Sequence, residues 1–491
     1  MRCAVVTAAG TAKDADDDGH ATGAEAARGA VREDGRAPGG RPPGGGPLPR
    51  PLLRAAVELY LDLHAHPELS GHEHRTADRL AARLAGHGCT VTRSVGGGHG
   101  LVGVLRNGPG PTVLLRTELD ALPVTEATGL PYASTTPGVM HACGHDLHIA
   151  AVAGAVAHLA ATRDTWRGTV LVVGQPEEET LRGARSLLTE GRLYERFGVP
   201  DAVLAQHAAP LPAGTLAHVP AGGPPLMAGS LAVEAVLHGR GGHAATPHLN
   251  VDPVLMAAAT VLRLRTVVAE ATAPAEQAVL TVGSVRAGER GNITPDHAEL
   301  SLTVRAFTEE ALDRLAAAAE RVVRAEAAAS GAPRTPEFTV TARSPALRPD
   351  PALTARVRRA HEALLGPGRV LDLAGSAATE DVPHFASHGQ GGPGRQGGDA
   401  GPGGSAGAVG SAGSTGSEAA GAVPVAYWML GTTGAGPWRT ARAGGTPVPP
   451  NHAPGFAPDV RAALPVGIGA LAAAARQVLD PGPAGSPEAA S

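Results

Sequence analysis

Short β-branched segments alternate with longer, apolar-periodic segments along most of the chain. Helical spacing begins near Leu52 and recurs over Glu73–Gly86, with Pro67 marking the break between the two. A third helix is expected over Leu147–Ala161. The β-branched runs, each closed by glycine or proline, are predicted strands: Thr90–Val95, Leu101–Arg106, Thr112–Arg116, Thr169–Val173 and Ala202–Ala205. This alternation indicates an α/β sheet, in which ligands gather at the carboxyl ends of strands.

The pattern changes near Met227, where a second set of elements begins. Its expected members are strands Ser230–His238, Ala278–Val285, Ala298–Ala306 and Phe338–Thr341, and helices Pro253–Ala271 and Glu309–Ser330. Their β-α-β-β-α order, closed by the last strand, is typical of a ferredoxin-like α+β module. Because α/β-like sequence resumes at Pro351, with a strand at Val423–Leu430 and a helix at Leu464–Val478, this module is inserted rather than appended.

Two segments lack a periodic apolar face. Residues 1–49 are rich in Gly, Ala, Asp, Arg and Pro and cannot bury enough apolar surface to offset chain entropy. The Gly/Ala/Ser run at 389–422 is expected to be a flexible surface insertion. The predicted plan is a disordered tail (1–49), a catalytic domain in two parts (50–226 and 342–480), an inserted dimerisation or lid domain (227–341) and a short tail (481–491).

Composition narrows the function classes. With 491 residues the chain is long enough for two or three domains, and its net charge of -5 argues against nucleic-acid or anionic-membrane partners. Three cysteines, Cys3, Cys89 and Cys143, cannot build a disulfide framework and fit a reducing compartment. We find no signal-peptide h-region and no run of the roughly 18 apolar residues that a membrane span needs. A cytoplasmic protein is therefore the expectation.

The densest chemistry lies in Met140–His148, where three histidines, a cysteine and an aspartate occupy nine positions. Imidazole and thiolate are ligands that zinc prefers, so a metal site is one interpretation. The other is structural: a small core cysteine beside surface histidines, brought together by composition alone. This stretch does not decide between them.

Other metal-capable side chains follow predicted strands. Glu177, Glu178 and Glu179 come directly after Thr169–Val173, and consecutive carboxylates repel one another unless a cation offsets them. His207 follows the strand that ends at Ala205, and a proline-rich loop near the C-terminus carries His452. Taken singly, these residues also fit a solvated acidic loop, an ordinary loop histidine and a surface turn.

Several segments carry a family resemblance. They are Leu114–Glu126, His141–Asp146, Gln175–Glu179, His238–His248, Asn292–Asp296 and His452–Phe456. In this order they resemble the amidohydrolases that cleave N-acyl amino acids, a group that includes hippurate hydrolase, the plant indole-acetyl-amino-acid hydrolases, aminoacylases and bacterial metallo-carboxypeptidases. The resemblance covers roughly Arg54–Leu479 apart from the insertion.

The resemblance implies a hydrolase with two divalent metal ions per subunit. The ligands it implies are Cys143, His145, Glu179, His207 and His452. Zinc is the first expectation, and manganese, nickel and cobalt are compatible. The hypothesis that the Cys143 sulfur bridges the two metals is open. Glu178 matches the general base, which takes a proton from water at the metal and returns it to the leaving amine.

Four further positions acquire expected roles from the resemblance. Asp120 would orient a ligand imidazole, although a turn or cap aspartate is the alternative. His243, beside two glycines, would stabilise the oxyanion of the tetrahedral intermediate. Asn292 would contact the carboxylate end of the substrate, and Arg305 would assist unless it is a surface strand residue. A homodimer through the inserted domain is also implied.

Two features depart from the family pattern. Glu177 replaces a small residue, which adds negative charge beside the base, and the 389–422 insertion follows the Glu380–Asp381 pair where relatives have a short connection. The predicted function is hydrolysis of an N-acyl amino acid or a small peptide-like amide. The alternatives are a hydrolase of an N-succinyl or N-acetyl biosynthetic intermediate, a catalytically inactive metal-binding scaffold, and a thiol redox sensor that lacks a resolving cysteine.

Overall fold

The computed structural model describes residues 48–273, 276–386 and 422–479. The predicted N-terminal tail as far as residue 47, the predicted insertion as far as residue 421 and the C-terminal tail lie outside the described residues.

A mixed sheet of eight strands forms the centre of the catalytic domain. In spatial order its strands are β1 (Thr90–Val95), β2 (Gly100–Asn107), β4 (Gly168–Gln175), β3 (Thr112–Glu118), β5 (Ala202–Pro212), β14 (Val425–Thr433), β6 (Leu216–His218) and β13 (Val370–Asp372). The four central strands β4, β3, β5 and β14 run parallel. Strands β1 and β2 pair antiparallel to their neighbours, β6 pairs antiparallel to β14, and β13 pairs parallel to β6. The predicted mixed α/β sheet is confirmed.

Helices cover both faces of this sheet. One face packs against α1 (Arg50–Ala65), α2 (His74–Gly86), α3 (His145–Ala161), α8 (Pro351–Leu365) and α11 (Val460–Leu479), and the other against the shorter α4 (Gly183–Leu188), α5 (Leu193–Phe197) and α9 (Pro383–Ala386). Along β3, Val113 and Leu115 enter one apolar core while Leu114 enters the other. Burial on both faces explains why β3 is apolar throughout rather than alternating.

Helix α11 is long and apolar enough to cross a bilayer by length and composition, which the sequence analysis did not expect. Most of it is buried, and it packs against α3, α8 and β14. Extensive contacts with other elements are typical of a core helix, which is apolar because it is enclosed by protein. The structure also contains a short helix, α10 (Ala435–Arg442), and the 3-10 turns Arg163–Thr165, Pro247–Leu249 and Pro367–Arg369.

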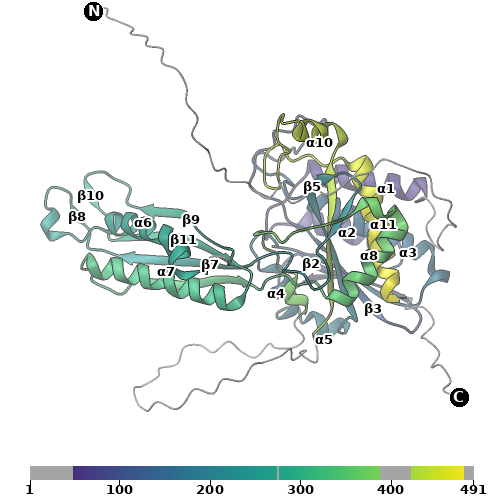
Figure 1. Cartoon of the computed structure of the whole chain (residues 1–491), viewed down its shortest axis with the longest axis horizontal. Helices are drawn as coiled ribbons and strands as arrows, with labels where there is room; N and C mark the ends of the chain where they lie inside the picture. The colour runs from purple at the N-terminus through teal and green to yellow at the C-terminus, as the bar shows by residue number, and fades with distance from the viewer. Residues whose placement is uncertain (1–47, 274–275, 387–421, 480–491) are drawn as a thin grey trace, which may run out of the picture. The chain divides into compact units, whose positions relative to one another are not determined.

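The inserted domain is a four-stranded antiparallel sheet with two helices (Figure 1). Its spatial order is β12 (Glu337–Ser344), β7 (Gly229–His238), β11 (His297–Ala306) and β9 (Ala278–Ala287), and both α6 (Pro253–Ala271) and α7 (Glu309–Ala329) pack on it. The Asp252 and Thr308 side chains cap the two helices by accepting hydrogen bonds from Val254 N and Ala311 N. The predicted ferredoxin-like module is confirmed.

Most predicted strands extend further than the sequence pattern indicated. Strand β5 continues to Pro212, so His207 lies within a strand rather than after one. Strand β12 continues to Ser344, past the predicted domain limit at 341. The small pair of strands β8 (Gly242–His243) and β10 (Ile293–Thr294) was not anticipated. The domain boundaries at 226/227 and 341/342 stay a prediction.

Candidate metal centre

The predicted ligands converge at one edge of the eight-stranded sheet. Strand β3 leads into Asp120, its parallel neighbour β4 leads into Glu178 and Glu179, and β5 carries His207. Because β4, β3 and β5 run parallel, their carboxyl ends meet on one side. Helix α3 begins there with His145 as its first residue.

Cys143 lies at the middle of the cluster. Its Sγ atom is 3.4 Å from His207 Nε2 and 3.2 Å from His452 Nε2. The loop that carries His452 is held against it, because His452 N donates a hydrogen bond to Ala142 O at 2.8 Å. His452 adopts a left-handed φ of 69°, so this loop conformation needs the tertiary contacts that surround it.

Glu179 completes the set. Its Oε1 atom is 3.4 Å from His452 Nε2 and 3.9 Å from His145 Nε2. Among the described residues, five groups of three side chains could each hold a metal ion, with ligand atoms within 4.8 Å of one another. Two of them consist wholly of predicted ligands: Cys143, His145 and His207 form one, and Cys143, Glu179 and His452 form the other. All five predicted ligands are therefore brought together, and Cys143 belongs to both groups.

The hydrogen bonds of two imidazoles leave their metal-facing nitrogens free. His145 Nδ1 is 2.7 Å from the Asp120 carbonyl, and His207 Nδ1 is 2.8 Å from the Ala208 carbonyl. A carbonyl only accepts, so both Nδ1 atoms carry a proton, and in the neutral imidazole form that binds metal each Nε2 atom holds a lone pair. Among the described residues, the buried His145 Nε2 and Glu179 Oε1 have no hydrogen-bond partner.

Such unpaired buried atoms cost about 1–3 kcal/mol each unless something else binds them. Thiolate, imidazole and carboxylate are a donor set that suits zinc and similar divalent ions. The residues present therefore fit the metal ions that the sequence implied.

The charges in the cluster favour a thiolate. Burial alone would raise the pKa of Cys143, but the neighbouring His207, His145 and His452 outweigh it and hold that pKa well below its ordinary value. Hydrogen bonds to Cys143 and Glu179 raise the pKa of His452 to about 10. A deprotonated sulfur is the form that binds metal.

Glu178 lies beside the ligands and belongs to neither of the two groups of predicted ligands. Its side chain is 5% exposed, and its Oε2 atom is 3.7 Å from His145 Nε2. Burial first, then the negative charges of Glu380 and Glu179, raise the pKa of Glu178 well above its ordinary value. A carboxylate with a raised pKa next to a water-binding centre is suited to accept and return a proton.

The sequence of this chain matches a known protein family and curated relatives. Residues 114–410 match the family model described as peptidase family M20/M25/M40. The chain is 34% identical over 328 residues to an N-acetyl-L-cysteine deacetylase of Bacillus subtilis, covering 66% of this chain and 76% of that one. This chain belongs to peptidase family M20/M25/M40.

Two further relatives extend the family comparison. An Arabidopsis thaliana IAA-amino acid hydrolase, ILR1-like 2, is 33% identical over 334 residues, which are 67% of this chain and 74% of that one. The crystal structure of the Bacillus subtilis YxeP protein, described as a dinuclear metal-binding peptidase of family M20, aligns with a TM-score of 0.63 and 27% identity. That alignment covers 88% of this chain and 99% of the other, which supports the two-domain M20 architecture.

A histidine and an aspartate near the ligands of this M20 protein have other partners. His148 Nε2 accepts a hydrogen bond from Ala208 N at 2.7 Å, so its protonated Nδ1 donates to Glu118 at 2.8 Å. Asp146 Oδ2 lies 2.6 Å from His64 Nδ1 in α1, and its Oδ1 accepts from Leu147 N. Asp146 therefore ties α1 to α3 and does not orient one of the predicted ligands.

Asp120 supports the ligands, but mainly through its backbone. Its carbonyl accepts the His145 Nδ1 proton, while carboxylate atom Oδ1 lies 3.4 Å from the same nitrogen. Carboxylate atom Oδ2 accepts from Ser70 Oγ at 2.8 Å and from Glu179 N at 2.9 Å. Asp120 thus joins the ligand histidine to the backbone of the acid loop, by which we mean Glu177–Glu179.

Glu177 belongs to none of the candidate ligand groups of the described residues, and the effect of its charge beside Glu178 stays a prediction. It has a left-handed φ of 52°, and its side chain lies beside Gly71. Gly144 is the other backbone constraint: its φ is 84°, and a Cβ there would lie 2.8 Å from Ala208 Cβ. The turn before α3 therefore requires glycine.

Sequence reasoning missed a buried charge cluster around Arg116. This guanidinium is 1% exposed and binds Glu118 as well as Glu380 and Asp381, each at 3.0 Å from Nη2. Asp381 also accepts from Gln175, and Tyr427 donates to Glu380 at 2.7 Å. A single arginine inside the apolar strand β3 was the available signal, since a buried charge needs buried partners.

The structure pairs two of the predicted inserted-domain residues and separates the third. Asn292 and His243 are neighbours, because Ala244 N donates to Asn292 O and Ile293 pairs with His243. Arg305 lies near the other end of β11, about 27 Å along the strand from His297 at about 3.4 Å per residue. Arg305 donates to Ala377 O instead, so one chain cannot offer Asn292 and Arg305 to the same small carboxylate.

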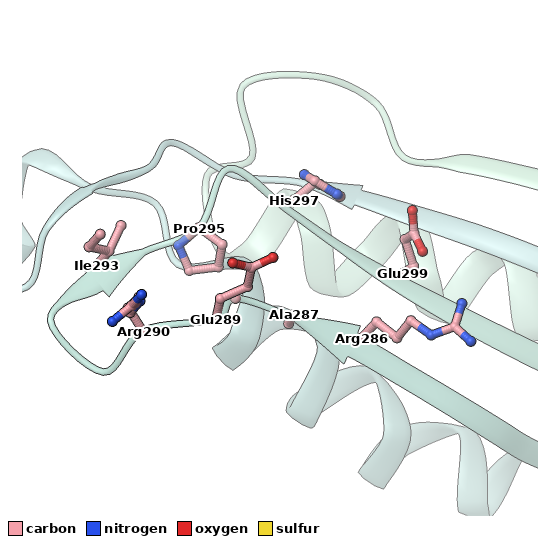
Figure 2. A pocket seen from close by; sticks show the side chains of 9 residues that line it. Arg286, Ala287, Glu289, Arg290, Ile293, Pro295, His297 and Glu299 are labelled. Carbon is pink, nitrogen blue, oxygen red and sulfur yellow. The ribbon is translucent and has the colours of Figure 1, made fainter.

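A hollow of about 400 Å³ also lies on the inserted domain (Figure 2). Its lining is of mixed charge, comprising Arg286, Ala287, Gly288, Glu289, Arg290, Ile293, Pro295, His297 and Glu299. It contains none of the candidate ligands. The hollow is therefore distinct from the metal centre.

Proposed function

We propose that this M20 protein is a metal-dependent amidohydrolase that cleaves the amide bond of N-acyl amino acids to a carboxylic acid and an amino acid. One observation carries the proposal: Cys143, His145, Glu179, His207 and His452 converge on one point, with the buried Glu178 beside them. The names of the relatives support this substrate class, since they include enzymes acting on N-acetyl-L-cysteine and on IAA-amino acids.

The five converging residues are the proposed ligands of two divalent ions, with zinc preferred. Cys143 is the proposed bridge, a role supported by its membership of both three-residue groups. When bound, the ions supply Lewis acidity toward the attacking water and the substrate carbonyl. His145 and His207 hold their ring orientation through the carbonyls of Asp120 and Ala208.

Glu178 is the proposed general base. Its carboxylate accepts a proton from the attacking water as the water oxygen bonds to the amide carbon. The same proton then passes to the leaving nitrogen when the carbon–nitrogen bond breaks, so no covalent enzyme intermediate forms. His243 is proposed to stabilise the oxyanion, and its neighbour Asn292 to bind the substrate carboxylate.

A homodimer through the inserted domain is proposed as well. Exposed apolar side chains line α6 and the edge strand β9, namely Val254, Leu255, Leu262, Val279 and Val285. Exposed apolar surface of this kind marks contact sites between proteins. Light scattering of wild type and Leu262→Arg tests it: a dimer is expected to become a monomer, and a monomeric wild type would contradict it.

The function is tested with Glu178→Gln. Wild type loaded with zinc, manganese, nickel or cobalt is assayed on N-acetyl, N-succinyl and N-benzoyl amino acids, and metal content is measured by mass spectrometry. We expect the variant to keep its metal and to lose about 10²–10⁴-fold in kcat, the usual contribution of a general base. Wild-type turnover in a metal-loaded variant would remove Glu178 from its role, and a metal-loaded wild type without amidase activity would favour a scaffold.

A further inference from the structure

The acid loop donates a backbone hydrogen bond to a buried carboxylate at each of its ends. At one end Glu179 N donates to Asp120 Oδ2. At the other end Glu177 N donates to Glu73 Oε1 at 2.9 Å. Glu178, the proposed base, lies between these two anchored amides.

The Glu73 carboxylate that accepts from Glu177 N lies in the protein interior. Its side chain is fully buried, and its Oε1 atom also accepts from Gly71 N at 2.9 Å. Glu73 immediately precedes α2, and its carbonyl accepts from Ala77 N within the first turn of that helix. Among the described residues its Oε2 atom has no hydrogen-bond partner. The two amides that donate to Oε1, Gly71 N and Glu177 N, therefore hold this buried carboxyl group.

The backbone that Glu73 holds is conformationally unfavourable. Glu177 has a φ of 52° and Leu181, four residues later, has a φ of 57°. Residues other than glycine keep a left-handed conformation only where surrounding contacts impose it. Release of the Glu177 amide would let φ return to negative values, and the rotation would redirect the next side chain, that of Glu178.

The loop before α2 reaches the other anchor too. Ser70 Oγ donates to Asp120 Oδ2, the same oxygen that accepts from Glu179 N. The segment Ser70–Glu73 therefore contacts Glu177 directly and Glu179 through Asp120. None of the proposed ligands, the proposed base or the proposed substrate-binding residues lies in Ser70–Glu73.

We propose that Glu73 is a positioning residue that fixes the backbone of the acid loop and thereby aims the Glu178 carboxylate at the candidate metal centre. The proposal rests on the proposed function for its kinetic consequence. Its structural consequence, the protection of the Glu177 amide, holds in the metal-free protein whether or not the chain is an amidohydrolase.

The test compares Glu73→Ala and Glu73→Gln with a matched control, Glu68→Ala. The Glu68 carboxylate accepts from Arg75 N and Thr76 N, so it holds the same end of α2 but none of its side-chain contacts reach the acid loop. Hydrogen exchange at the Glu177 amide is measured on the full chain purified without metal. Steady-state kinetics are then measured after metal loading.

In Glu73→Ala we expect exchange at Glu177 to accelerate at least tenfold and kcat to fall at least tenfold, with KM changed less than threefold, since misplacing a reacting group by about 1 Å costs about 10² in rate. Glu73→Gln keeps an acceptor oxygen and is expected to retain both protection and kcat within threefold. Glu68→Ala is expected to lower the melting temperature while leaving both readouts unchanged.

Unchanged exchange in a folded Glu73→Ala protein would overturn the proposal, and so would equal effects of Glu68→Ala. Should the alanine variant fail to fold, Glu73→Met fills the same space without accepting a hydrogen bond, and wild-type protection and kcat in that variant would overturn it. Inactive wild type with normal Glu177 protection would instead reject the proposed function and leave the exchange comparison in force.

Discussion

The two sheets of this protein handle polar residues in different ways. The eight-stranded sheet is covered on both faces, and Arg116 and Glu118 of its strand β3 are buried, with Arg116 paired to Glu118 and to the buried Asp381. The four-stranded sheet alternates instead: along β11, alternate side chains are buried, and β9 exposes much of its length. The eight-stranded sheet holds its buried charged side chains in a network of ion pairs. In the inserted domain, His243 of strand β8 and Asn292, just before β10, are exposed.

This contrast predicts different consequences of mutation. Substitutions at the edge of the large sheet should affect metal content and stability together, since each side chain has several buried partners. Substitutions at the tip of the inserted domain should affect catalysis without affecting either. Substitutions in the two regions test this difference between the sheets, beginning with a metal ligand.

Cys143→Ala and His243→Ala form the first comparison. Loss of the sulfur common to both ligand groups is expected to lower metal content by at least one ion per chain and kcat by at least about 10³-fold. His243→Ala should keep the full metal content and lose about 10²–10³ in kcat, as expected when one oxyanion donor is removed. Elemental analysis with kinetics measures both, and full metal content in Cys143→Ala would break the comparison.

The second comparison is between Arg116→Met in the large sheet and Arg305→Met in the inserted domain. Removing the Arg116 guanidinium leaves Glu118, Glu380 and Asp381 buried without their cation, and breaking such a pair costs about 3–5 kcal/mol of unfolding free energy. Arg305 makes one hydrogen bond to the Ala377 carbonyl, so its replacement should cost about 1 kcal/mol or less. Urea unfolding of the metal-free proteins measures both, and equal losses would contradict the prediction.

The third prediction concerns pH and a buried histidine pair, His218 and His361, that belongs to none of the candidate ligand groups of the described residues. His218 Nε2 lies 3.0 Å from His361 Nδ1, and His361 Nε2 lies 3.1 Å from the Ala470 carbonyl. Burial lowers the pKa of His218 to about 2, with the neighbouring His361 adding to the shift, and burial lowers the pKa of His361 to about 4. Both histidines are therefore neutral in the folded protein across the mildly acidic range.

Below the unfolded pKa of about 6.5 the unfolded chain binds protons that the folded chain does not, so stability falls as pH falls. Each histidine contributes a slope of about 1.4 kcal/mol per pH unit between about pH 6.5 and pH 4. His218→Gln keeps a donor toward His361 and cannot titrate, so its unfolding free energy should depend on pH less steeply by that amount. Parallel curves for wild type and variant would reject the assignment.

The smallest effect is expected at Glu177. Its side chain lies outside the ligand groups of the described residues, and its φ is left-handed, a conformation that asparagine tolerates. Glu177→Asn should retain metal content and kcat within about threefold and change stability by about 0.5 kcal/mol or less, the usual range away from buried contacts. A loss of one metal ion in this variant would place Glu177 among the ligands after all.

Much of the secondary structure followed from the sequence alone. The helix over Pro253–Ala271 and strand β1 were predicted to the residue. Most other strands of the two sheets were located but drawn too short, and β6 and β13 were not predicted. Local spacing determines these elements because side chains two, three or four positions apart share a face. The strand ends fell outside the patterns, since pairing with a neighbour continues where apolar alternation stops, as in β5 beyond Ala205.

The candidate ligands also followed from the sequence, because Cys143, His145, Glu179, His207 and His452 belong to recognisable motifs. The contacts of the residues around these ligands did not follow from the sequence. Only the folded chain gave His148 and Asp146 their partners and separated Arg305 from Asn292. It also brought Glu73 under the acid loop and Glu380 and Asp381 against Arg116. Each of these contacts joins segments distant in the chain, and such contacts depend on which elements pack together rather than on local spacing.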